Sequence, residues 1–413
     1  MLRSRNRWSI GTQPRIVRML AVGVLAAALT VSAGCSRAEQ PTWHTGAPEP
    51  VSKASATITE PAENATNVPT SAEISFTTTD AVETTVTLTD ESGKAVKGSL
   101  SADGTTWRPA KQLAWGTTYT ATVTVTDSDG RTASTSRTFT TMTKPSKLVS
   151  VSSFLGDGAV VGVGMPMIVR FSRAVPEEYR DDVQRRMTLR SDPPQEGIWH
   201  WVSGTEVRYR PKEFWKAGTK IHYEVRTGGL PLGDGWYAAN DLTVDLSIGS
   251  STIMVVDNKT KTMTVYQDGK VTRTMPVSLG KPKTPSSSGT MVVMEKHRKT
   301  VFDTYDELGP EEGYRIDIEY AQRLTWGGEF IHSAPWSVAD QGVRNVSHGC
   351  VNLSPDNARW LFNQTKIGDP VTVKGTEVKL KHGNGWTDWN LSWEEYVKGS
   401  ALPYQPSQSR STA

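Results

Sequence analysis

Two side chains in the C-terminal third of the chain have the residue types of a nucleophile and its general base. Cys350 follows Ser-His-Gly at positions 347–349, and His332 lies 18 residues earlier, after the strand-like segment 328–331. A thiol nucleophile needs a base, and that base is usually an imidazole. Because 18 residues leave room for a loop and a return, we predict nucleophilic catalysis by Cys350 with His332 as the first candidate base.

Two further histidines lie near this cysteine in the sequence. His348 is two residues away, but a short loop controls its direction poorly, and His297 is expected at a solvated strand end. An inert, buried thiol is the ordinary alternative for an unpaired cysteine. The polar flank and Gly349, which lets the backbone approach a ligand closely, argue against it. A helix predicted to begin after the capping Ser354 brings N–H groups and a dipole that favour the thiolate.

Other classes of protein fit parts of this pattern. His332, His348 and Cys350 resemble three zinc ligands with an open position, but the chain lacks a closely spaced His pair, so we expect no metal. A non-catalytic wall-binding protein would need only the β modules described below. A thiol peptidase or carboxypeptidase would use the same cysteine with water in place of an amine.

The elements around the site are predicted to be mainly strands. Alternating segments joined by turns such as Asp268-Gly269 continue from residue 251 to about 332. A helix then starts with Pro355 as its first residue, and 370–373 forms a closing strand. These elements give a catalytic domain over 251–375.

The last forty residues contain three tryptophans at helix-like spacing, Trp386, Trp389 and Trp393. Large aromatic side chains are costly to leave exposed. We therefore expect residues 376–413 to contain a Trp-rich C-terminal subdomain that packs as part of the catalytic fold.

Two β modules precede the catalytic domain, over 55–146 and 147–250. Both are predicted as immunoglobulin-like sandwiches, because the first is Thr- and Val-rich with period-two alternation and short turns. Arg108-Pro109 recurs 102 residues later as Arg210-Pro211, which indicates a tandem repeat. A short helical insert is expected near 177–187, and the two modules are interpreted as a spacer.

The N-terminus predicts export. Five arginines precede an apolar stretch over 19–33 that is too short to span a bilayer comfortably, and the segment ending at Cys35 resembles a bacterial lipobox, although Ser32 replaces the usual Leu. We predict a lipoprotein signal over 1–34, a lipid on Cys35 and a flexible linker over 35–54, with an uncleaved membrane anchor as the alternative. The protein is then expected on the outer face of the cytoplasmic membrane, facing the cell wall.

The 413-residue chain carries a net charge of only +3, and the part after the predicted signal carries −2. This composition shows no basic field, which argues against nucleic acid as a partner. With two cysteines in all, a disulfide scaffold is excluded.

The segments Ile331-His332-Ser333-Ala334-Pro335-Trp336 and Ser347-His348-Gly349-Cys350-Val351-Asn352 resemble the signature of YkuD-type L,D-transpeptidases. The whole layout resembles the actinobacterial, mycobacterial type. The resemblance implies a mainly β protein: two tandem immunoglobulin-like sandwiches, a β-rich YkuD-type catalytic domain and a Trp-rich C-terminal subdomain.

The resemblance also implies an activity. The enzyme would form 3-3 cross-links between peptidoglycan stem peptides, the donor and the acceptor, without a cofactor. The catalytic residues would be Cys350 as nucleophile, His332 as base, the Ser333 carbonyl that orients the imidazole, and an oxyanion loop of His348, Gly349 and Cys350. Trimming of stems by an L,D-carboxypeptidase remains the alternative, and β-lactams of the carbapenem class would act as inhibitors.

Substrate contacts follow from the same resemblance. Tyr314 would line the donor site, Trp336 the pocket or lid, and Ser347 and Asn352 would complete the signature. Phe302 departs from the Met that relatives often carry in the lid. We expect the segment 301–331 to act as that lid, with glycines as its flexible points.

Overall fold

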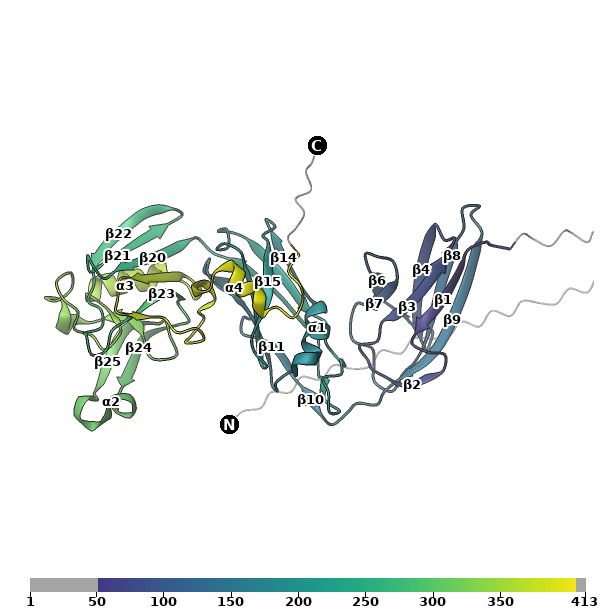
Figure 1. The fold of residues 1–413 in the computed structure, drawn as a ribbon, viewed down its shortest axis with the longest axis horizontal. Helices are drawn as coiled ribbons and strands as arrows, with labels where there is room; N and C mark the ends of the chain where they lie inside the picture. Colours follow the sequence, from purple (N-terminus) through teal and green to yellow (C-terminus); the bar gives the residue numbers. More distant parts are fainter. Residues whose placement is uncertain (1–50, 406–413) are drawn as a thin grey trace, which may run out of the picture. The chain divides into compact units, whose positions relative to one another are not determined.

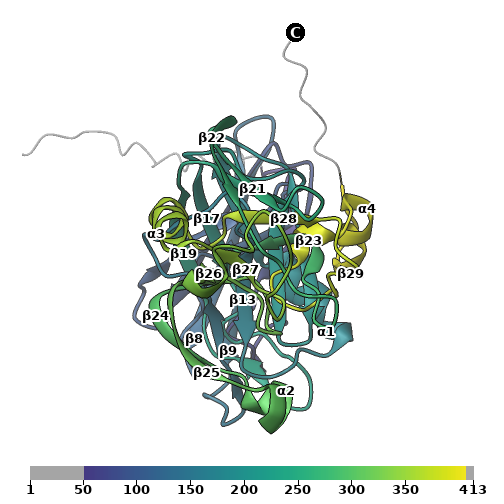
Figure 2. The same cartoon turned by 90° about the vertical axis from the view of Figure 1, so that its left-hand side faces the viewer.

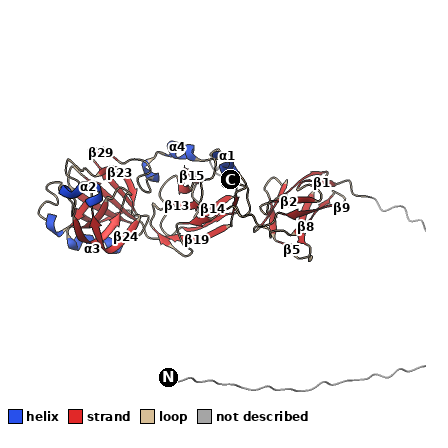
Figure 3. Cartoon of the chain, turned by 90° about the horizontal axis from the view of Figure 1, so that it is seen from below, coloured by secondary structure: helices blue, strands red, loops and turns tan. Residues whose placement is uncertain are grey.

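The computed structural model describes residues 51–405, and strands dominate this part of the chain (Figures 1 and 3). The predicted signal, Cys35 and most of the linker lie outside the described residues. No helix within 51–405 is long and apolar enough to cross a membrane.

The first sandwich has two sheets that enclose one core. Its four-stranded sheet has the order β1 (Ser55–Glu60), β3 (Ile74–Thr79), β7 (Thr106–Pro109) and β6 (Gly98–Leu100). Its five-stranded sheet has the order β2 (Ala65–Val68), β9 (Thr132–Thr141), β8 (Thr118–Thr126), β4 (Glu83–Asp90) and β5 (Ala95–Val96). Every second residue of β8 is buried, from Tyr119 to Val125, as the sequence alternation predicts.

The second sandwich repeats this arrangement. One sheet has the order β11 (Val151–Ser153), β13 (Met167–Phe171), β16 (Glu206–Pro211) and β15 (Gly197–Ser203). The other has the order β12 (Val160–Val161), β19 (Leu242–Ile248), β17 (Lys220–Val225) and β14 (Met187–Asp192), and β10 (Leu148–Val149) pairs with β18 (Tyr237–Ala238). The repeated Arg-Pro pairs end equivalent strands, β7 and β16, which confirms the internal repeat. The predicted helical insert is α1 (Glu177–Arg185).

The catalytic unit consists of two sheets and one packed helix. A six-stranded sheet has the order β22 (Lys270–Pro276), β21 (Thr262–Gln267), β20 (Thr252–Asp257), β28 (Pro370–Lys374), β23 (Ser287–Val292) and β29 (Val378–Lys379). The second sheet has the order β24 (Glu295–Asp303), β25 (Arg315–Arg323), β26 (Phe330–Ser333) and β27 (Val351–Leu353), and these strands face the viewer in Figure 2. A shared apolar core joins both sheets to α3 (Pro355–Gln364).

Of the two α-helices in this unit, one was expected from the local sequence and one was not. α3 begins where the sequence predicts, because Ser354 accepts a hydrogen bond from the Asn357 N–H at 3.4 Å and Pro355 occupies the first helical position. α2 (Tyr305–Glu312) lies in the connection between β24 and β25, where only strand and loop were expected, and it breaks at Gly309 (φ 73°). A one-turn 3₁₀ helix, Pro335–Ser337, follows β26.

The C-terminal segment differs from the prediction in two ways. Its tryptophans do not share one helix, because the segment folds into the 3₁₀ turn Asp388–Asn390, the short α4 (Trp393–Tyr396) and the turn Val397–Gly399. Its aromatic residues also pack mainly on the second sandwich. Trp386 belongs to the core of that sandwich and meets Phe154 edge-on at 4.7 Å between ring centroids.

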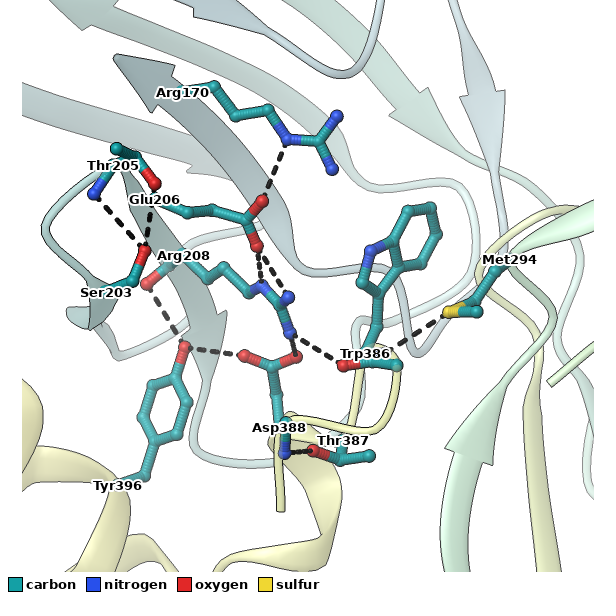
Figure 4. A network of polar contacts seen from close by, with 12 residues as sticks. Arg170, Ser203, Thr205, Glu206, Arg208, Met294, Trp386, Thr387, Asp388 and Tyr396 are labelled. Carbon is teal, nitrogen blue, oxygen red and sulfur yellow. Dashed lines mark hydrogen bonds and ion pairs between the residues drawn. The ribbon is translucent and has the colours of Figure 1, made fainter. Parts of the chain in front are cut away.

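Polar contacts reinforce this packing around one buried guanidinium (Figure 4). Arg208 of β16 pairs with Glu206 on its own strand and, at 2.9 Å, with Asp388 of the C-terminal segment. The Tyr396 hydroxyl donates to the Arg208 carbonyl at 3.1 Å. The segment therefore contacts both units, because the core that holds Trp386 also includes Met294 of the catalytic unit.

Candidate active site

The register of two parallel strands brings the predicted nucleophile and base together. In β26 and β27, Ile331 pairs with Val351 and His332 pairs with Asn352. Side chains alternate along a strand, so Ile331 and Val351 point into the core of the catalytic unit. His332 and Cys350 therefore share the opposite face of the sheet, in diagonal positions on neighbouring strands.

The thiol of Cys350 is almost fully buried, with 8% of the residue exposed. It packs with Phe330 and Ile318 of the same sheet, and its Sγ donates to the Gly328 carbonyl at 3.7 Å. Burial, together with a smaller contribution from the charge of Glu329, raises the pKa of the Cys350 thiol to about 12. In the resting structure desolvation outweighs the Phe330 N–H that stabilises the anion, and the contribution of the following helix to the thiolate stays a prediction.

His332 is held in a defined tautomer. Its Nδ1 lies 2.8 Å from the Ser333 carbonyl, and because a carbonyl only accepts, Nδ1 carries the proton and Nε2 is left as the acceptor. Burial lowers the pKa of His332 to about 4. The imidazole is thus neutral at neutral pH and competent to receive a proton.

The loop before Cys350 is fixed by its own hydrogen bonds. The Ser347 hydroxyl donates to the Cys350 carbonyl at 2.7 Å and accepts from the Gly349 N–H at 3.1 Å. Gly349 has φ +120°, a backbone conformation that residues with a Cβ rarely adopt. The Gly349 amide is therefore occupied within the loop, whereas the resemblance implied that it faces a developing oxyanion.

The other predicted residues surround this pair. Tyr314 lies beside His348, with ring centroids 5.4 Å apart, and Phe302 meets His332 edge-on at 5.3 Å. Trp336 lies 6.0 Å from the His332 ring and is 54% exposed. Asn352 is buried and its side-chain amide donates to the Ser337 hydroxyl at 3.1 Å, so it connects β27 to the turn after β26. His297, by contrast, lies on exposed β24, where it pairs with Glu295.

Three side chains at the site carried no signal in the sequence. Lys281 donates from Nζ to His348 Nε2 at 2.9 Å, and Ser286 donates to the Gly349 carbonyl at 2.6 Å. Glu329 accepts the Ser287 N–H at 2.9 Å. The first two come from the connection between β22 and β23, which is more than sixty residues from Cys350, so no local motif could have placed them there.

The zinc alternative concerns the same histidines. Within residues 51–405, no group of three His, Cys, Asp or Glu side chains is arranged to hold a metal ion. His332 Nδ1 and His348 Nε2 instead meet the Ser333 carbonyl and Lys281.

Comparison with known proteins supplies the family. The model of the L,D-transpeptidase catalytic domain (YkuD) matches residues 251–373, and that of a bacterial Ig domain matches 65–231. L,D-transpeptidase 2 of Mycobacterium tuberculosis is 36% identical over 355 residues, which cover 85% of each chain. The chain belongs to the YkuD family of L,D-transpeptidases. L,D-transpeptidase 5 of the same species is 34% identical over 83% of this chain and 76% of its own.

A solved structure of this family is also similar to the chain. The structure of the LD transpeptidase LdtMt1 in complex with imipenem shares 37% identity, covers 56% of this chain and all of its own, and has a TM-score of 0.47. By the family models and the curated relatives, the chain is an L,D-transpeptidase in which immunoglobulin-like sandwiches precede the catalytic domain, as the resemblance in the sequence indicated.

Proposed function

We propose that this L,D-transpeptidase forms 3-3 cross-links in peptidoglycan through a thioester on Cys350. The observation that carries the proposal is the shared sheet face of Cys350 and His332, with His332 Nδ1 held by the Ser333 carbonyl. Cys350 Sγ attacks the carbonyl of the third residue of a tetrapeptide donor stem. His332 Nε2 takes the thiol proton and returns it to the departing nitrogen of the terminal D-Ala.

The second half of the reaction reuses the same groups. The amine of an acceptor stem attacks the thioester carbonyl, a new amide bond forms, and the sulfur leaves and regains a proton. Transfer to the amine needs limited access of water to the thioester. The burial of Cys350 and His332, which are 8% and 4% exposed, supports this requirement. We also propose that the β24–β25 connection with α2 acts as the lid that opens for substrate to enter.

The substrate contacts divide into two kinds. Tyr314 and the exposed Trp336 flank His348 and His332 and are proposed to contact the donor stem. The side chains of Ser347 and Asn352 form hydrogen bonds to other groups of the protein, so we propose that they hold the loop and β27 in place. Formation of the oxyanion site then requires the Gly349 N–H to exchange its Ser347 partner for the substrate oxygen.

Two further proposals concern partners and location. We propose that carbapenems acylate Cys350, because their strained carbonyl mimics that of the donor and a 37% identical relative is known in complex with imipenem. We also propose anchoring by a lipid on Cys35, outside the cytoplasmic membrane and facing the wall, on the basis of the lipobox-like sequence.

One assay tests the proposed cross-linking. The protein is incubated with a disaccharide-tetrapeptide, and products are identified by mass spectrometry. A 3-3 dimer with loss of D-Ala supports transpeptidation, whereas tripeptide alone supports the carboxypeptidase alternative. The Cys350→Ala variant should yield neither product, and any turnover by that variant contradicts the assignment of the nucleophile.

A further inference from the structure

Glu329 is a carboxylate at the active site that the reaction described above does not use. It directly precedes Phe330 of β26, and its Oε1 accepts the Ser287 N–H at 2.9 Å. Its Cγ lies 3.7 Å from the position that a Cβ on Gly349 would occupy, so the side chain rests against the loop that carries Cys350. Glu329 therefore borders the Cys350 loop, close enough for its charge to act on the thiol.

The second carboxylate oxygen is left available. Among residues 51–405, Glu329 Oε2 has no hydrogen bond or ion-pair partner, and it is not one of the fully buried polar atoms. The turn before it, Trp326 to Gly328, is exposed. The free oxygen thus lies next to an exposed turn, from which a ligand can approach it.

The charge of this group opposes the first chemical step. A carboxylate next to the thiol disfavours the thiolate, and burial in turn raises the pKa of Glu329. No cation of the described chain compensates it. A partly buried carboxylate that hinders the nucleophile and lacks a cationic partner is suited to a cation brought by a substrate.

We propose that Glu329 binds the ammonium group of the acceptor stem and directs it to the thioester on Cys350. The inference rests on the proposed transpeptidation, in which the acceptor is an amine. The ammonium nitrogen sheds one proton through the carboxylate to solvent and attacks the thioester carbon. As the C–N bond forms and the C–S bond breaks, its second proton passes to the Cys350 sulfur, and an amide and a free thiol result. Glu329 would thereby favour amine over water as the acceptor.

The test measures how one acyl-enzyme divides between two acceptors. Wild type, Glu329→Gln and the control Glu319→Gln are given the disaccharide-tetrapeptide, and the ratio of dimer to tripeptide is followed by mass spectrometry. Glutamine keeps an oxygen for the Ser287 N–H. We expect the ratio to fall about tenfold or more in Glu329→Gln, whereas acylation by imipenem stays equal or becomes faster. Glu319, which pairs with Lys299 on the exposed face of the β24–β25 ribbon, should change neither value.

The outcomes separate this proposal from the function on which it rests. A wild-type enzyme that forms no dimer contradicts the transpeptidase proposal itself. If the ratio of dimer to tripeptide is the same in wild type and in Glu329→Gln, only the proposed role of Glu329 is overturned. If Glu329→Gln fails to fold, Glu329→Asp serves instead, because it keeps the charge but shortens its reach. An unchanged ratio in that variant, with an unchanged rate of dimer formation, overturns the proposal.

Discussion

The Arg208 network of the second sandwich and the Cys350 site of the catalytic unit both bury ionisable side chains, but only the first pairs them with opposite charge. Arg208 has 6% of its side chain exposed and contacts both Glu206 and Asp388, whose side chain is 2% exposed. Cys350 and His332 are buried to a similar degree, yet their nearest fixed partners are carbonyl groups. A buried group with an oppositely charged partner stays charged, whereas the buried thiol and imidazole, which lack such a partner, stay neutral.

This difference shows what each region is built to do. A buried ion pair resists change, because removing either partner strands the other charge. The Cys350 site instead holds a neutral donor and a neutral acceptor, which is the arrangement that the proposed proton transfer requires. The following predictions test that contrast, beginning with the largest effect.

Replacement of the nucleophile should abolish acylation. In Cys350→Ser the hydroxyl pKa lies far above that of a thiol, so His332 is too weak a base for it, and acylation by imipenem should fall more than about 10⁴-fold. Intact-protein mass spectrometry over time checks this. One adduct on wild type, on the peptide that contains Cys350, is expected. An adduct on Cys350→Ala at any site would show that another group reacts.

Removal of the proposed base should also slow acylation strongly, but less than replacement of the nucleophile does. His332→Ala leaves the thiol, with its pKa near 12, without an acceptor for its proton, and acylation should slow by about 10²- to 10⁴-fold. The same time course measures the rate, and circular dichroism confirms folding. Rates equal to wild type would mean that His348 or solvent serves as the base.

Breaking the paired network should cost stability and leave the chemistry intact. Asp388→Ala leaves the Arg208 charge buried and half-paired, at a cost of about 3–5 kcal/mol, which should appear as a lower melting temperature. Glu319→Ala, which removes an exposed pair, should change stability by less than about 1 kcal/mol. An equal effect of both variants would refute the contrast between buried and exposed pairs. Imipenem acylation of folded Asp388→Ala should match wild type.

The smallest predicted effect is the pH dependence of alkylation at Cys350, which reports the pKa of its thiol directly. Because the pKa of Cys350 is raised above its usual range, the thiolate fraction keeps growing above pH 9, and alkylation by iodoacetamide should rise about tenfold from pH 9 to pH 10. For an ordinary thiol with a pKa of about 8.5, the thiolate fraction and the alkylation rate rise less than about 1.5-fold over that interval. Peptide mapping assigns the label to Cys350 in protein shown to stay folded. A plateau by pH 9 would indicate an unshifted thiol.

Contacts of the C-terminal segment also bear on the interpretation that the two sandwiches act only as a spacer. Trp389 Nε1 donates to the Gly164 carbonyl of the second sandwich at 2.6 Å, and the Arg210 guanidinium lies over the rings of Trp389, Trp393 and Tyr396. A fragment that begins at residue 251 would expose these aromatic faces to water. We expect such a fragment to be less stable than one that includes residues 147–250, as thermal unfolding of both would show.

Much of the site was readable from the sequence because its signals are local. The spacing of His332 from the Ser-His-Gly-Cys segment identified the family and predicted a nucleophile and a base, and the Ser354-Pro355 pair identified the helix that follows. Strand alternation, as in β8, has a period of two residues and needs no knowledge of the rest of the chain.

The tertiary structure decided what depends on the surroundings of a residue. Arg108 and Arg210 occupy equivalent positions of the repeat, yet Arg108 forms a partly exposed pair with Glu73, whereas Arg210 is buried under the aromatic rings of the C-terminal segment. Similarly, nothing near Cys350 in the sequence reveals that desolvation raises its pKa, or that Glu329, Lys281 and Ser286 adjoin its loop. The sequence determined which groups can react, because reactivity begins with residue type and spacing. Burial and charge at a group are sums over neighbours distant in the chain, so only the folded structure could determine its protonation state and partners.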